Sequence, residues 1–139
     1  MTVVTGSVEI DTGGEVDIID VTGDVKRVVS DSGIKSGIAC IFTMSSTSTV
    51  TTIEHEPGLL RDLPDALERL FPKNIEYGHE QMWHDGNGHG HVRASFMKPS
   101  LTVPFVDGSL LLGTWQQIVF VELDNKRRRR RLVVQMVGE

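Results

Sequence analysis

The sequence predicts an α+β protein in which antiparallel strands dominate and helices are few. Segments rich in Val, Ile and Thr alternate with Gly-containing turns along most of the chain, a pattern typical of antiparallel sheets. Two stretches, 22–33 and 57–72, carry apolar residues at helical spacing instead. The length of 139 residues fits one domain of common size. We therefore expect a single domain over residues 1–139.

Four strands are expected in the first half of the chain. Residues 3–10 and 15–21 are the first two expected strands, separated by the turn signal Asp11–Gly14. Residues 37–44 are apolar enough for a buried central strand, and residues 45–53 are β-prone but largely hydroxylic. The hydroxyl side chains of that last strand form either a solvated sheet face or a binding site for a phosphate or substrate oxygen.

Two helices are expected to flank the strands. In the first, Thr22 is the expected cap, three valines share one face, and Gly33 occupies the position of a left-handed C-terminal cap. The second lies between Pro57 and Pro72, where five leucines follow helical spacing. Pro64 removes a backbone donor inside it, so we expect a kink or a new start there.

The second half ends in a β meander that follows an irregular stretch. Residues 73–98 are expected to be irregular. The strands that follow are expected at 100–106, 109–112, 114–123 and 127–137, with Asp-Gly and Asp-Asn turns between some of them.

Composition excludes several classes of protein. Hydrophobic residues make up 39% and charged residues 24% of the chain, which argues against collagen-like and disordered proteins. No apolar run approaches the ~20 residues of a membrane span, so we expect a cytoplasmic protein without membrane contact. The single Cys40 excludes an intrachain disulfide and a cysteine-based zinc site. The net charge of -5 argues against a general nucleic-acid binder.

A histidine cluster is the strongest chemical signal. Four of the five histidines, His79, His84, His89 and His91, lie within thirteen residues. If the segment after Gly88 is extended, side chains two apart share a face, and His89 and His91 project together with the next alternate residue. Two such imidazoles, with His79 and a carboxylate or water, can hold one metal ion. The alternative is a polar loop whose histidines only form hydrogen bonds.

Two glutamates flank His55 directly after the hydroxylic strand. A carboxylate there, Glu54 or Glu56, can act as a general base or orient another group. It can equally stabilise the N-terminus of the helix that begins near Pro57.

Five consecutive arginines, Arg127–Arg131, alternate between two faces if their segment is a strand. We favour a structural or subunit role for most of them, although guanidinium groups also suit phosphate. Upstream, Trp115 is most simply a core residue, and a glutamine beside it, Gln116 or Gln117, is expected to face a site or an interface.

Several of these segments together resemble a known family. They are Ser100-Leu101-Thr102-Val103-Pro104, Asp107-Gly108, Leu112-Gly113-Thr114-Trp115-Gln116, the arginine-rich strand, Glu54-x-Glu56-Pro57-Gly58, Tyr77-x-His79 and Asn87 to Arg93. They resemble the YjbQ family, also called the secondary thiamine-phosphate synthase family. The resemblance implies a jelly-roll-like β-sandwich with flanking helices, a homotrimer, and a histidine-containing pocket near the subunit boundary.

The resemblance also implies a reaction, in which a hydroxymethylpyrimidine diphosphate and a thiazole phosphate condense with loss of pyrophosphate. Many members have His-Thr-Thr where this chain has Ser45-Ser46-Thr47, Asn-Glu where it has Ile53-Glu54, and Asn-x-Asp-x-His where it has Asn87-x-His89-x-His91. One histidine is lost and another gained.

On this basis we expect His79, His89 and His91 to hold a divalent ion, with zinc favoured by the imidazole ligands. Glu54 or Asp85 would move a proton, and Arg93 would stabilise phosphate oxygens. The expected substrate-binding residues are Ser45, Asn87, Arg93 and Gln116.

Two functions from different classes follow. The first is a metal-dependent, thiamine-phosphate-type transferase that acts on a small phosphorylated molecule. The second is a trimeric protein that binds a metal or small ligand without catalysis. A catalytic metal keeps an open position in a concave pocket, whereas a structural one is closed by protein ligands.

Overall fold

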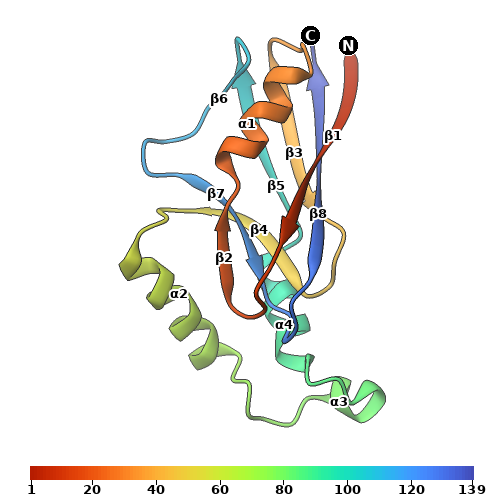
Figure 1. Cartoon of the computed structure of the whole chain (residues 1–139), viewed down its shortest axis with the longest axis vertical. Coiled ribbons are helices and arrows are strands. Elements are labelled where there is room, and N and C mark those ends of the chain that lie inside the picture. The colour runs from red at the N-terminus through yellow and green to blue at the C-terminus, as the bar shows by residue number, and fades with distance from the viewer.

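The computed structural model describes residues 1–139 as eight strands and four helices. Figure 1 shows the sheets upright, with both chain termini at one end of the molecule and α3 and α4 at the other. In chain order the elements are β1 (Thr2–Asp11), β2 (Asp17–Asp20), α1 (Thr22–Asp31), β3 (Gly37–Thr43), β4 (Ser48–Ile53), α2 (Pro57–Leu70), α3 (Gly78–Trp83), α4 (Gly88–Met97), β5 (Ser100–Val106), β6 (Ser109–Leu110), β7 (Gln117–Glu122) and β8 (Arg129–Gly138).

The strands form two sheets in which every pairing is antiparallel. The larger sheet has the order β1-β8-β3-β5-β6, and the smaller one has the order β2-β7-β4. In the larger sheet Leu132 of β8 lies opposite Val8 on one side and Thr43 on the other. The predicted α+β class with mainly antiparallel strands is confirmed.

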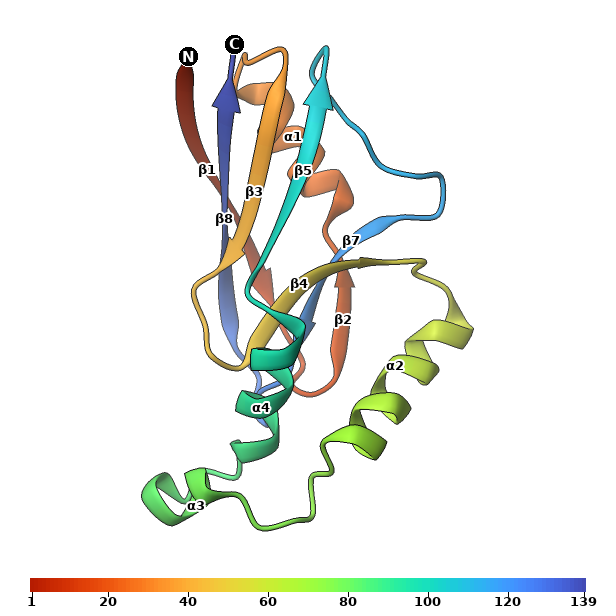
Figure 2. The same cartoon turned by 180° about the vertical axis from the view of Figure 1, so that it is seen from behind.

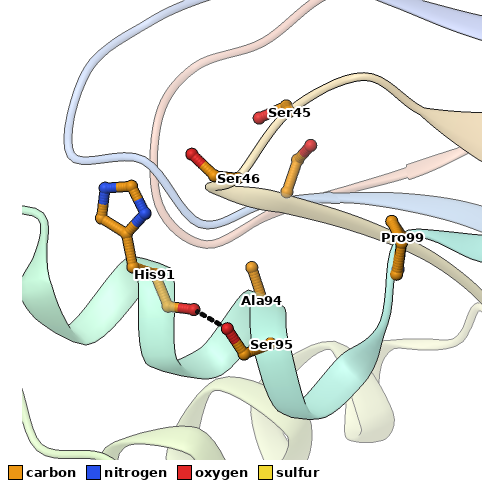
Figure 3. Close-up of a pocket in the computed structure, with 7 residues that line it drawn as sticks. Ser45, Ser46, His91, Ala94, Ser95 and Pro99 are labelled. Atoms are coloured by element: carbon orange, nitrogen blue, oxygen red, sulfur yellow. Dashed lines mark hydrogen bonds between the residues drawn. The ribbon is translucent and has the colours of Figure 1, made fainter.

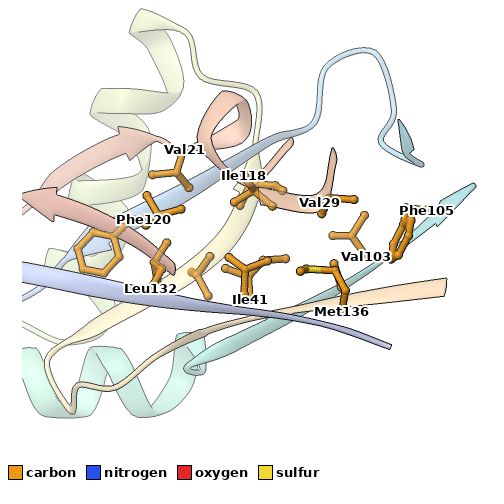
Figure 4. Packing of buried hydrophobic residues seen from close by; sticks show 14 of the residues in the cluster. Val21, Val29, Ile41, Val103, Phe105, Ile118, Phe120, Leu132 and Met136 are labelled. Atoms are coloured by element: carbon orange, nitrogen blue, oxygen red, sulfur yellow. The ribbon is translucent and has the colours of Figure 1, made fainter. Parts of the chain in front are cut away.

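The main core fills the space between the sheets. Alternate residues of β8, namely Leu132, Val134 and Met136, are fully buried, while those between them are exposed or partly so. From the opposite side Ile118 and Phe120 of β7 contribute, and Figure 4 shows these side chains meeting in one layer. Helix α1 adds buried valines and covers the part of the larger sheet that the smaller one does not reach (Figure 1).

A second apolar cluster lies on the other face of the smaller sheet. Val119, Val121 and Leu123 point away from the main core and contact Leu67 of α2 and Ala94 of α4. Both faces of β7 are therefore covered, which explains why almost the whole strand is buried. Figure 2 shows α2 and α4 on this side of the molecule. The packing of Ala94 fixes α4 at the end of the smaller sheet.

The helices differ from expectation in number and detail. The stretch 73–98, expected to be irregular, contains α3 and α4. Helix α2 runs through Pro64 without a break. Thr22 does not cap α1; its hydroxyl donates a hydrogen bond to Asp20 (2.6 Å) instead. None of the four helices combines the length and apolar character that crossing a bilayer requires.

Candidate functional site

Three side chains of types that can coordinate a metal ion meet where α3 and α4 join, at the end of the molecule away from the termini (Figure 1). His79 comes from α3, Asp85 from the turn that follows, and His91 from α4. One ligand atom from each lies within 4.8 Å of the others. The two imidazole rings are 4.2 Å apart between centroids, and His79 Nε2 lies 3.0 Å from Asp85 Oδ1.

The environment of the cluster favours the protonation states that bind metal. Burial, and then the nearby His79, lower the pKa of His91 below its ordinary value. A hydrogen bond from the backbone N–H of Asn87, outweighing burial and helped by His79, lowers the pKa of Asp85. At neutral pH the site thus offers a neutral imidazole and an ionised carboxylate, the forms that coordinate cations.

The turn between α3 and α4 is held by a second carboxylate. Glu80 of α3 accepts hydrogen bonds from the backbone N–H groups of Gly86 and Gly88, each at 2.7 Å. Asn125, in the turn between β7 and β8, donates to the backbone carbonyl of Asp85 at 2.9 Å. Asn87 Oδ1 in turn accepts from the Asn125 backbone N–H at 2.9 Å. These bonds fix Asp85 between the two histidine-bearing helices.

A polar cavity of about 350 Å³ borders the cluster and shares Asp85 and His91 with it. Its other walls come from the β3–β4 loop, including Ser45 and Ser46, and from the β7–β8 turn and the start of β8. The remaining charged residues of its lining are Asp124, Arg128 and Arg130.

The two arginines that line this cavity are both paired with acids. Arg130 donates to the two carboxylate oxygens of the fully buried Glu122, at 2.7 and 2.8 Å. Arg128 donates to Asp124 at 3.1 Å, and its side chain is 43% exposed. Burial raises the pKa of Asp124, but hydrogen bonds from the Lys126 backbone and Arg128 outweigh it, so the carboxyl stays ionised at neutral pH. Arg128 keeps free donors for an anion, whereas Arg130 is largely committed to the core.

A second, smaller cavity of about 230 Å³ also borders His91 (Figure 3). It shares Ser45, Ser46 and His91 with the 350 Å³ cavity, which we call the charged cavity because Asp85, Asp124, Arg128 and Arg130 line it. Its remaining lining consists of Ser48 of β4, Ala94 and Ser95 of α4, and Pro99. No charged residue lines it.

The segment after Gly88 is helical and not extended, so His89 and His91 do not project from one face. Side chains two apart on a helix point in nearly opposite directions. His91 consequently faces the cluster, while His89 is only 2% exposed and lies 2.5 Å from the Glu15 carboxylate. The structure does not bring His89 together with His79 and His91. Asp85, expected to move a proton, takes the place that His89 was expected to fill.

The other predicted site residues divide into two groups. Ser45 and Asn87 line the charged cavity. Arg93 is buried, donating to Glu68 and to the carbonyl of Phe71, so it ties α4 to α2 instead of facing the cavity.

Two further predicted residues, Glu54 and Gln116, also lie away from the cavity. Glu54 is exposed beyond the far end of β4, roughly 20 Å along the strand from Ser48. Gln116 bonds to Gly113 and Thr52 around the loop that precedes β7. Of the two glutamates beside His55, Glu56 caps α2 by accepting from Gly58 and Leu59.

Sequence reasoning assigned no individual role to Ser46, Asp124 or Arg128, which all line the charged cavity. The run of five arginines was the signal that could have pointed to Arg128, because alternation along a strand places successive arginines on opposite faces. Arg129 and Arg131 are exposed near Glu9, whereas Arg130 points inward. Arg128 lies just before β8, outside the strand.

Comparison with known proteins gives consistent matches over nearly the whole chain. The family model described as "UPF0047 protein YjbQ-like" matches residues 6–139. A UPF0047 protein of Methanothermobacter thermautotrophicus is 42% identical over 130 residues, which cover 94% of this chain and 90% of that protein. The UPF0047 protein YugU of Bacillus subtilis is 31% identical, with 95% and 98% covered.

Solved structures agree with these matches. A YbjQ-like protein of unknown function from Sulfolobus solfataricus superposes with a TM-score of 0.94 at 33% identity, covering 99% of both chains. A hypothetical protein from Aeropyrum pernix gives a TM-score of 0.90 at 32% identity, covering 97% of this chain and 98% of the other.

Proposed function

This chain belongs to the YjbQ-like UPF0047 family, and from that premise we propose that it is a metal-dependent enzyme acting on a small phosphorylated molecule in the cytoplasm. The observation that carries the proposal is the convergence of His79, Asp85 and His91 within 4.8 Å beside a cavity with an available guanidinium group.

The donor set fits a catalytic transition metal. Two imidazoles and one carboxylate are a common ligand set of catalytic zinc, whose fourth position is left for water or substrate. Ligand atoms of tetrahedral zinc lie roughly 3.4 Å apart, so small side-chain rotations would bring the cluster to that spacing. Cobalt, nickel and manganese also accept these ligands. A bound divalent ion would supply positive charge next to a departing phosphate oxygen.

The residues around the cavity suit a phosphate group. Arg128 retains N–H donors beyond its bond to Asp124. The hydroxyls of Ser45 and Ser46 belong to the same lining and can donate to phosphate oxygens. Arg93, expected earlier in this role, is replaced by Arg128.

The specific reaction we propose is that of a secondary thiamine-phosphate synthase. The thiazole nitrogen uses its lone pair to form a bond to the methylene carbon of the pyrimidine. The bond between that carbon and the diphosphate oxygen breaks, and its electrons leave with pyrophosphate. No proton has to be moved for this exchange, so Asp85 is free to serve as a ligand, and the demand on the protein is to stabilise the leaving group.

The first test is the metal content of untagged protein purified without a nickel column. We expect close to one zinc or other transition-metal ion per chain. Asp85→Asn and His91→Ala should each lose most of it, whereas His84→Asn, at an exposed histidine outside the cluster, should keep it. Absence of metal after reconstitution, or full occupancy in both ligand variants, contradicts the site.

The second test is the reaction itself. Metal-loaded protein supplied with the pyrimidine diphosphate and the thiazole phosphate should release thiamine phosphate and pyrophosphate in equal amounts. Asp85→Asn should reduce this rate at least tenfold, and Glu54→Gln should leave it unchanged because Glu54 lies away from the cavity. Bound metal without any product would favour a trimeric binding protein without catalysis, our second candidate.

Self-association is part of both candidates, and we propose a homotrimer. The outer face of the larger sheet supports it, because no helix covers that face (Figure 2). Ile38 and Phe42 of β3 are 48% and 39% exposed there, beside the half-exposed Val3 and Val106. Exposed apolar surface of this kind marks interaction sites. Sedimentation should give three 15.4 kDa chains per particle, and Phe42→Glu should yield monomers; a wild-type monomer contradicts the trimer.

A further inference from the structure

Two cavities of different character meet at the proposed metal site. The first is lined by four charged side chains, Asp85, Asp124, Arg128 and Arg130. The second is lined only by hydroxyl, methyl, proline and imidazole groups. His91 and the pair Ser45-Ser46 belong to both linings, so the β3–β4 loop and α4 mark a boundary between them.

The uncharged cavity has room for one small ring. Its volume is about 230 Å³, and a cavity of about 150 Å³ is known to hold benzene in a protein. Figure 3 shows the Ala94 methyl group directed toward the serines of the facing loop, with Ser95 beside it. The Ser95 hydroxyl donates to the carbonyl of His91 at 2.8 Å, which holds it close to the helix.

The contrast in charge determines how a ligand can lie. A phosphate dianion is held more strongly beside the cationic Arg128 than by hydroxyl groups alone, whereas an uncharged ring would leave ionised groups of the charged cavity without water or partners. A molecule that carries both parts has one favourable orientation across the boundary.

We propose that the ligand spans both cavities, with its phosphate beside Arg128 and its uncharged part between Pro99 and α4, and that Ala94 and Ser95 set the size of that uncharged part. This inference rests on the proposed function for the phosphate end. It adds that Ala94 and Ser95 determine specificity for the uncharged end of the ligand.

Substitutions in the uncharged cavity provide the test, with phenyl phosphate and inorganic phosphate as probes of the metal-loaded protein. Burial of roughly 60 Å² of the phenyl ring should make phenyl phosphate bind about tenfold more tightly than inorganic phosphate. Ser95→Leu fills the cavity from an exposed position of α4. Ala94→Val is a second and smaller change, because Ala94 also packs against the second core.

Both variants should bind inorganic phosphate as the wild-type protein does and lose most of the tenfold preference. Phe96→Leu is the matched control, since Phe96 is exposed on the same helix and lines neither cavity, and it should retain the preference. Equal affinity of the wild-type protein for the two probes, or a preference that survives both cavity-filling variants, overturns the inference while leaving the phosphate site intact. Failure of the loaded protein to bind either probe overturns the inference and the proposed function together.

Discussion

At the scale of single residues, the two neighbouring histidines of α4 show how the backbone assigns roles to identical side chains. His91 faces His79 and Asp85, whereas His89 is buried against Glu15 on the opposite side of the helix. The Glu15 carboxylate also accepts a hydrogen bond from Lys73 at 2.5 Å. The His89 contact joins the β1–β2 turn to α4 and holds the helix in the orientation that points His91 at the cluster.

The Glu15 carboxylate makes stability depend on pH. Burial alone would raise the pKa of Glu15, but the hydrogen bonds from Lys73 and His89 outweigh it and lower the pKa. A carboxyl whose folded pKa is depressed contributes stability above its unfolded pKa, about 4.3, and loses that contribution as the pH falls through the folded value.

Glu15→Gln should therefore lower the free energy of unfolding by about 1–3 kcal/mol at pH 7. The difference from wild type should shrink as the pH falls from about 4.5. Urea unfolding at pH 7, 5, 4 and 3 measures this. Glu9→Gln, at an exposed glutamate, should change stability by less than about 0.5 kcal/mol throughout. A constant difference across the range would show that the ionised carboxylate of Glu15 and its contacts with Lys73 and His89 do not carry the effect.

At the scale of elements, the connection between α3 and α4 determines the geometry of the cluster. Because Glu80 binds the backbone at both Gly86 and Gly88, it holds the turn that carries Asp85 and the first residue of α4. Glu80→Gln replaces one acceptor oxygen by a donor that faces a backbone N–H. We expect metal affinity to fall about 10–100-fold, as for other groups that orient ligands.

Competition with a chelator measures that affinity. Glu76→Gln, at an exposed glutamate on the segment before α3, is the control and should bind metal as the wild-type protein does. If Glu80→Gln also keeps the wild-type affinity, the histidine-bearing helices are held in place by something other than this turn.

The start of α4 depends on glycine for close packing. A Cβ at Gly90 would lie 2.4 Å from the carbonyl oxygen of Leu123, so Gly90→Ala should force α4 away from β7 and cost about 1–3 kcal/mol. At Gly23 in α1 a Cβ would meet nothing within 4 Å, and Gly23→Ala should stabilise by about 0.5–1 kcal/mol. Thermal unfolding compares the two substitutions. If the two substitutions change the stability by the same amount and in the same direction, α4 has room to accommodate a Cβ at Gly90.

Elements also account for what the sequence could and could not predict. The strands were placed within a few residues because turn signals bound them and their alternation is strong. Helix α4 was missed because Gly88-His89-Gly90-His91 has poor helix propensity, and its glycines are required by contacts with Tyr77 and Leu123 that are distant in the sequence. Because this segment was expected to be non-helical, His89 was expected in the cluster. In the structure Asp85 is the third member instead. Ser45, expected to bind substrate because of the family resemblance, lies in the β3–β4 loop and not in a strand, and it lines the cavity.

At the scale of the whole molecule, three separate parts of the chain bring their charges to one end. The α3–α4 turn contributes Asp85, β7 and the residues after it contribute Glu122 and Asp124, and β8 with its preceding turn contributes Arg128 and Arg130. In the lining of the cavity two carboxylates, Asp85 and Asp124, balance two guanidinium groups, Arg128 and Arg130. A divalent ion would add two positive charges beside this neutral lining, and the cavity would then attract an anion.

This added charge predicts that metal and phosphate bind cooperatively. Inorganic phosphate should bind the zinc-loaded protein at least about tenfold more tightly than the metal-free protein, and linkage requires that phosphate raise metal affinity by the same factor. Calorimetry on the loaded and metal-free protein, without excess metal in solution, gives the first factor, and chelator competition with and without phosphate gives the second. Arg128→Gln should weaken phosphate in both forms yet keep the ratio, because it removes a donor without changing the charge that the metal adds. Equal phosphate affinity with and without metal would mean that the anion is held by Arg128 and the serines alone, and that the charge of the metal is not felt in the cavity.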